Sequence, residues 1–141
     1  MKNKLIYLCL IGFIGISNLL MSCSQTNKIN YKEVDKERVE ALNKEISEQG
    51  ITNIEEIANL YSPKDLYAEG NYSYEVTLTE DQPNYELKIK EEGVMDDSLD
   101  GVLSIISIKK VGNDLKVTNI KQAFKCKKDR GQQEWGPEFC N

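Results

Sequence analysis

The sequence predicts an α+β fold, in which two N-terminal helices pack on a four-stranded antiparallel meander sheet and a disulfide closes the C-terminal loop. Three observations support this prediction. Apolar residues recur at helical spacing up to residue 61, their period changes to two after residue 71, and a pair of cysteines frames the last segment. Because helices come first and strands follow, we expect the helices to cover one face of the sheet.

The first helix is predicted in the charged segment from Asn30 to Gln49, which contains no Gly or Pro. Asn30 and Glu33 have the spacing of a capping pair, and Gly50 follows as the residue that ends the helix. The apolar side chains of this segment recur roughly every third or fourth residue, which predicts one narrow buried stripe. They are Val34, Val39, Leu42 and Ile46.

A second, shorter helix is expected to begin at Thr52 or Asn53, each of which is followed three residues later by Glu, and to end at Ser62-Pro63. Together with one face of the sheet, the two helices should enclose a single hydrophobic core. The predicted core consists of Leu42, Ile46, Ile57, Leu60, Tyr74, Val76, Leu78, Leu87, Ile89, Ile106 and Phe124.

Four strands are predicted over residues 72–79, 85–90, 102–108 and 115–124, and in the first two of them apolar and polar side chains alternate. The third of these segments is apolar on both faces, so it should lie inside the sheet rather than at its edge. In the fourth segment the apolar parity switches between Val117 and Ile120. This switch predicts a β-bulge near Thr118-Asn119.

The N-terminus has the pattern of an export signal: Lys2 and Lys4, then an apolar run over residues 5–21 and a small residue before Cys23. The sequence Leu20-Met21-Ser22-Cys23 resembles the lipobox of bacterial lipoproteins. That resemblance implies cleavage before Cys23 and acylation of its new N-terminus. A transmembrane helix and an ordinary signal peptide are the alternatives, and the interrupted apolar run with its terminal Ser-Cys disfavours the first.

The predicted organisation is therefore a signal peptide over residues 1–22, a lipidated cysteine and tether over 23–30, and a single small domain over 31–141. In enteric lipoproteins, a residue such as Ser24 after the lipid cysteine implies passage to the outer membrane. We expect the domain to face the periplasm. Acyl chains on Cys23 would hold it at the membrane.

The composition limits the possible functions. Removal of Lys2 and Lys4 leaves 16 basic against 23 acidic residues, a net charge of −7 that disfavours binding to nucleic acid. The chain has no histidine, which removes the commonest general base and metal ligand. Cys126 and Cys140 remain once Cys9 and Cys23 are accounted for, and in an exported protein this pair predicts a disulfide.

The acidic loop between the second and third predicted strands comes closest to a metal motif. Asp96, Ser98, Asp100 and Gly101 occupy positions one, three, five and six of an EF-hand calcium loop. The twelfth position is Ser107 instead of a bidentate Glu, and a strand follows instead of a helix. We therefore predict a solvated loop, with no metal and no cofactor.

The segment between Cys126 and Cys140 is the best candidate for a binding surface. It contains Arg130, the only tryptophan, Trp135, and Phe139, and such side chains on a constrained loop are typical of interface hot spots. The alternative is that Trp135 and Phe139 fold back and cap the end of the sheet. The ending of the chain, with Arg130, Trp135 and Cys140, also resembles a closing motif of small uncharacterised exported bacterial proteins, a resemblance that implies no activity.

The sequence thus predicts a non-enzymatic envelope lipoprotein that binds a partner protein or a small ligand through an exposed loop. One alternative is an inhibitor or immunity-type protein that neutralises an envelope enzyme or toxin with this loop. Another is a hydrolase with paired carboxylates. It is disfavoured because the spacing identifies neither an acid nor a base.

Overall fold

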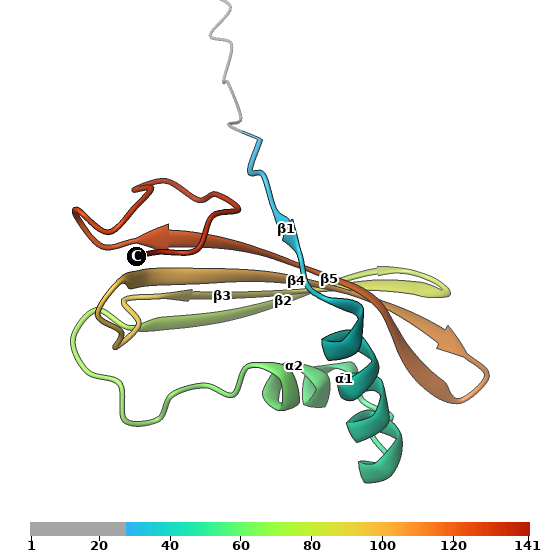
Figure 1. The fold of residues 1–141 in the computed structure, drawn as a ribbon. Helices are drawn as coiled ribbons and strands as arrows, with labels where there is room; N and C mark the ends of the chain where they lie inside the picture. Colours follow the sequence, from blue (N-terminus) through green and yellow to red (C-terminus); the bar gives the residue numbers. More distant parts are fainter. Residues whose placement is uncertain (1–27) are drawn as a thin grey trace, which may run out of the picture.

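The computed structural model describes residues 28–141, so the signal segment, the lipobox and Cys23 lie outside the described residues. Five antiparallel strands form one sheet with the order β1-β5-β4-β3-β2, and two helices lie on one of its faces (Figure 1). The elements are β1 (Lys32–Glu33), α1 (Lys36–Gln49), α2 (Ile54–Tyr61), β2 (Ser73–Asp81), β3 (Asn84–Glu92), β4 (Leu99–Val111) and β5 (Asp114–Cys126).

The prediction of four strands is wrong by one, because β1 adds a fifth at the edge of β5. Lys32 pairs with Gln122, and the N–H of Val34 donates to the carbonyl oxygen of Ile120 at 2.9 Å. Helix α1 consequently begins at Lys36, with Asp35 as its N-cap, instead of near Asn30. A two-residue strand has no alternation to detect, and it forms here because β5 offers unpaired backbone groups.

The remaining helix boundaries follow the predicted signals. Gly50 ends α1 in the left-handed conformation, with φ 65°, and its N–H bonds to carbonyl groups of the last turn. Asn53 caps α2, because its side-chain oxygen accepts a hydrogen bond from the N–H of Glu55 at 2.9 Å. The prediction of two helices followed by an antiparallel sheet is confirmed.

The predicted bulge in β5 is confirmed and has a structural partner. Ser107 pairs with Asn119, whereas Ile108 pairs with Val117, so Thr118 is the extra residue. Beside the bulge, the Asn43 amide donates to the carbonyl oxygen of Val117 and accepts from its N–H, each at 2.8 Å. Helix α1 thereby satisfies backbone groups of β5 that a neighbouring strand would otherwise bind.

The core lies between the helices and the sheet face to which β4 contributes Ile106 and Ile108. Most of the predicted core is confirmed, with Leu60, Tyr74 and Leu78 at its margin. Two assignments differ. Val76 is 40% exposed on the edge strand β2, whereas α2 packs mainly on β3, and Phe124 belongs to a separate cluster at the disulfide.

Candidate functional site

The C-terminal loop is attached to the outer edge of β5. The Cys126–Cys140 disulfide closes it, as predicted, and both cysteines are buried. The N–H of Phe124 donates to Gly136 O at 2.7 Å, and Phe124 O accepts from the N–H of Gly136 at 3.0 Å. The loop therefore continues the edge pairing that β1 begins, which places it beside β1 at one end of the sheet (Figure 1).

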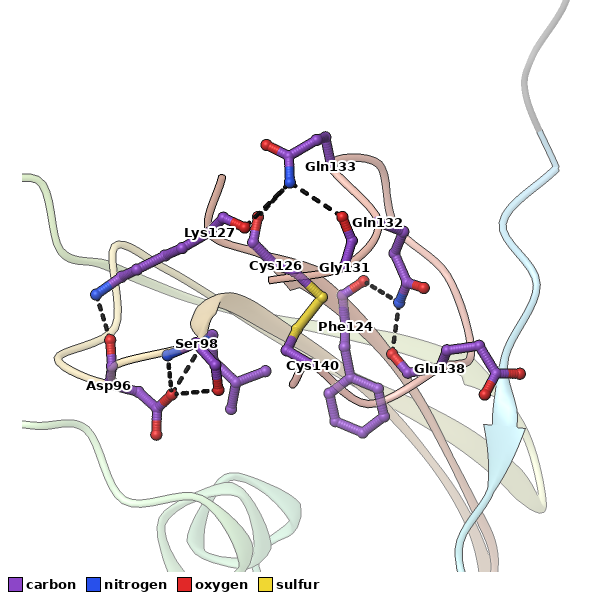
Figure 2. The surroundings of a disulfide bond; sticks show 11 residues. Asp96, Ser98, Phe124, Cys126, Lys127, Gly131, Gln132, Gln133, Glu138 and Cys140 are labelled. Atoms are coloured by element: carbon purple, nitrogen blue, oxygen red, sulfur yellow. Dashed lines mark hydrogen bonds between the residues drawn. A yellow bond between two sulfur atoms is a disulfide. The ribbon is translucent and has the colours of Figure 1, made fainter. Parts of the chain in front are cut away.

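Two glutamine side chains hold the loop in shape. The Gln133 amide donates to the carbonyl oxygens of Cys126, Lys127 and Gly131 at 3.1–3.3 Å. The Gln132 amide donates to those of Phe124 and Glu138, so it links β5 to the far side of the loop (Figure 2). Sequence reasoning missed both residues. The sequence does contain an indication of their role, because two adjacent glutamines occur in a segment without regular structure. The backbone carbonyl groups of such a segment need side-chain donors in place of a helix or a sheet.

Trp135 packs on the sheet face that the helices leave uncovered. Gly101 alternates with the core residues of β4, so its missing side chain would point to that face. The indole of Trp135 occupies this space, because a Cβ added to Gly101 would lie 2.7 Å from Cη2 of Trp135. Trp135 thus caps the sheet, which agrees with the structural alternative for this residue.

Phe139 lies on the opposite side of the loop and remains 61% exposed. Its ring meets that of Phe124 edge to face, with centroids 5.1 Å apart and planes at 75°. Beside this pair is a groove of about 380 Å³ between the loop and the start of α1. Its apolar lining residues are Val34, Leu99, Val102, Phe124 and Phe139, and Lys32 and Arg38 lie among the polar ones.

The basic residues of the loop differ in their contacts. Arg130 and Lys128 are exposed in the turn that follows β5, and the carbonyl oxygen of Arg130 accepts from the N–H of Asn141 at 2.8 Å. Lys127 instead donates to the carbonyl oxygen of Asp96 in the neighbouring β3–β4 loop (Figure 2). The structure therefore leaves Arg130 and Phe139 available for contact, whereas Trp135 serves packing.

Asp96 and Asp100, in and beside the acidic β3–β4 loop, have partners within the domain. Oδ1 of Asp96 accepts from the N–H groups of Ser98 and Leu99, each at 2.8 Å, which lowers the pKa of this carboxyl group. Asp100 pairs with Lys125 at 3.0 Å. Within residues 28–141, no three His, Cys, Asp or Glu side chains come together as a metal site would require.

A row of charges crosses the helix-free face beside Trp135. Glu92 lies between Lys90 and Lys125, with its Oε1 3.6 Å from Nζ of Lys125. The hydrogen bond that Lys90 donates lowers the pKa of Glu92, and the hydrogen bond that Lys125 donates to Asp100 raises the pKa of Lys125. These charges are partly exposed and paired with one another, and Glu92 and Lys125 lie opposite Gly101 on the two neighbouring strands.

A second carboxylate, Glu91, anchors the segment between α2 and β2. Ser62 Oγ donates to one of its oxygens, and the Tyr72 hydroxyl donates to the other at 3.1 Å. The Tyr74 hydroxyl completes the attachment by donating to the carbonyl oxygen of Ser62 at 2.8 Å. Both oxygens of Glu91 thus have structural partners, and the segment they hold carries the exposed side chains of Leu66 and Tyr67.

No helix within residues 28–141 is both long and apolar enough to cross a membrane. Comparison of the chain with protein-family models, with curated proteins and with solved structures found no match.

Proposed function

We propose that this chain is an envelope lipoprotein, anchored by lipid on Cys23, that binds a partner protein or a small ligand without catalysing a reaction. The binding surface in this proposal consists of Phe139, the adjoining groove and Arg130. We further propose that the domain faces the periplasm from the outer membrane. These proposals rest on the N-terminal pattern and on the architecture of the C-terminal loop.

The observation that carries the proposal is the exposure of Phe139. A phenyl ring that is 61% exposed contributes little to the core, yet the disulfide and the contact with Phe124 hold it in place. A fixed aromatic side chain loses little conformational entropy on binding, and aromatic residues are enriched where interfaces are strongest. The groove beside it has both apolar and charged lining residues and would receive a side chain or a ligand of matching character.

The test compares three versions of the full-length chain in native membranes: wild type, Phe139→Ala and Tyr67→Ala. Tyr67 is the matched control, because it is an aromatic residue that is 91% exposed and lies outside the C-terminal loop. Affinity capture should lose a specific companion with Phe139→Ala and retain it with Tyr67→Ala. Equal recovery from all three would refute the assignment of this surface.

The anchor is tested separately by metabolic labelling with a palmitate analogue. Wild type should incorporate the label, and Cys23→Ala should not. Equal labelling of the two chains would contradict lipidation at this residue while leaving the loop proposal open to its own test.

One observation favours the inhibitor or immunity-type alternative. The loop is hydrogen-bonded to itself and to β5 before any partner binds, and such preorganisation is typical of tight protein inhibitors. The two functions differ in their partner. If the captured protein is an enzyme or toxin whose activity falls on addition of the purified domain, and falls less with Phe139→Ala, the inhibitor proposal is supported.

A further inference from the structure

The two edges of the sheet differ in how they are covered. Along β5, backbone groups are paired with β1, with the Asn43 side chain and with Gly136 of the C-terminal loop. At the opposite edge, β2 pairs with β3 alone among residues 28–141. An uncovered strand edge presents a row of free backbone donors and acceptors to any other strand.

Strand β2 lacks most of the usual protections of such an edge. It has nine residues in continuous register with β3, without a bulge, and it contains no Pro, Gly, Lys or Arg. Short length, charged side chains, proline and bulges are the devices by which natural proteins block edge pairing, and of these β2 carries only the acidic Glu75, Glu80 and Asp81. The edge of β2 is therefore long, regular and able to accept a further strand.

The apolar side chains of β2 are also incompletely covered. Tyr74, Val76 and Leu78 point to the helix-bearing face, but α2 packs mainly against β3. Val76 remains 40% exposed, and the other two are only partly buried. The open backbone and the exposed apolar surface thus occur on the same strand.

We propose that β2 is a self-association edge, which pairs antiparallel with β2 of a second copy around a two-fold axis at Thr77. Thr77 is the midpoint of Ser73–Asp81, so this register uses the whole strand. Val76 then lies opposite Leu78 twice, and both side chains gain an apolar neighbour on the helix-bearing face. The helices of the two copies lie on the same face of the continuous sheet.

Charge favours this register. Its pairs place Glu75 opposite Thr79 and Asp81 opposite Ser73, and Glu80 faces a tyrosine, so no acid lies directly opposite an acid. Moving the axis to Leu78 would place Glu75 opposite Asp81, and like charges directly opposite one another are destabilising. The acidic residues of β2 therefore permit pairing with a second copy when the axis is at the centre of the strand.

An edge-to-edge contact buries less surface than the roughly 1,600 Å² of a standard interface, so the dimer should be weak. It is therefore tested by disulfide crosslinking and not by its dissociation on dilution. In the proposed register the two Thr77 residues face each other with Cα atoms about 4.5–5.5 Å apart, within the range of a disulfide. Full-length Thr77→Cys, oxidised in membranes of the expressing cells, should give a non-reducing band at twice the mass of the chain.

Thr79→Cys is the matched control, because it has the same residue type on the same strand and face. Its two copies would lie about 13 Å apart along the strands, too far for a disulfide. Thr79→Cys and Glu75→Cys should each stay monomeric alone and crosslink when co-expressed. The wild-type chain shows any crosslinking that comes from Cys9 or Cys23 instead of the introduced cysteine.

Val76→Lys, combined with Thr77→Cys, should abolish the dimer, because lysine on an edge strand blocks pairing. Circular dichroism of this variant should match that of Thr77→Cys, since Val76 is outside the core. Three outcomes would overturn the proposal: no dimer from Thr77→Cys, a crosslinked band of another mass, or equal dimerisation of Thr79→Cys alone.

Discussion

Trp135 occupies the space where every residue other than glycine would place a side chain at position 101. A Cβ on Gly101 would lie 2.7 Å from the indole and 2.7 Å from the carbonyl oxygen of Glu91. Since the C-terminal loop reaches β4 through this contact, glycine at 101 and tryptophan at 135 form one structural unit. Neither the strand nor the loop can change there independently.

Gly101→Ala should destabilise the domain by about 1–3 kcal/mol, because an added methyl group forces a shift in packed surroundings. Trp135→Ala should cost about 2–3 kcal/mol, less than a fully buried tryptophan, since its ring is only partly buried. The cost of Gly101→Ala should be smaller in the Trp135→Ala background. Denaturant unfolding of the four chains measures this coupling, and simple additivity would mean that the two residues do not share a constraint.

Asn43→Ala should lower the free energy of unfolding by about 1–3 kcal/mol, because it leaves the N–H and carbonyl groups of Val117 without their side-chain partner. Asn59→Ala is the control, since Asn59 is an exposed asparagine on α2. That change should be nearly neutral. If both variants unfold at the wild-type midpoint, the bridge between α1 and β5 contributes nothing to stability.

Replacing both Cys126 and Cys140 with alanine should cost about 3 kcal/mol, as expected for a loop of this length. The main core is a separate cluster from the one that contains the cysteines, so the four-strand meander should stay folded. Far-ultraviolet circular dichroism and hydrogen exchange can check this. Loss of protection throughout β3 and β4 would show that the loop is needed for the whole sheet.

Stability should fall in acid partly through Glu92. The pKa of Glu92 is lower in the folded chain than its ordinary value, so its ionised form stabilises the fold. This contribution is complete above the unfolded value of about 4.3 and is lost as the pH falls through the folded pKa. Glu92→Gln should therefore be less stable than wild type at pH 7, and the difference should shrink below about pH 4.

The exposed Glu134→Gln is the control for this pH series. Its difference from wild type should be small and should not show the same decline. A constant gap between wild type and Glu92→Gln from pH 7 to pH 3 would contradict the role of the Lys90 and Lys125 contacts.

Features with a local cause could be predicted from the sequence. The bulge at Thr118 is visible because the parity of apolar residues switches within a few positions, and Gly50 ends a helix by its own conformational freedom. The disulfide could be predicted from the number of cysteines that lie outside the predicted signal and lipobox. For the bulge and the helix end, the residues responsible are close together in the sequence. For the disulfide, a single pair of cysteines leaves one possible pairing.

Features that depend on distant contacts could not be predicted. Alternation in β2 indicates which face Val76 is on, but whether a helix covers that face depends on where α2 packs. Likewise, the composition of the C-terminal loop indicates two large aromatic residues without assigning their roles. Trp135 has a structural role because it packs against Gly101. Phe139 contacts the ring of Phe124 edge to face and remains mostly exposed.

The pairing of β1 with β5 joins the first strand of the described chain to its last. The hairpins from β2 to β5 need only sequential neighbours, and such local contacts form quickly. The outer edge of β5 instead pairs with segments from both ends of the domain. Strand β1 and Asn43 precede β5 in the chain and Gly136 follows it, so this edge is complete only when both ends of the domain are in place.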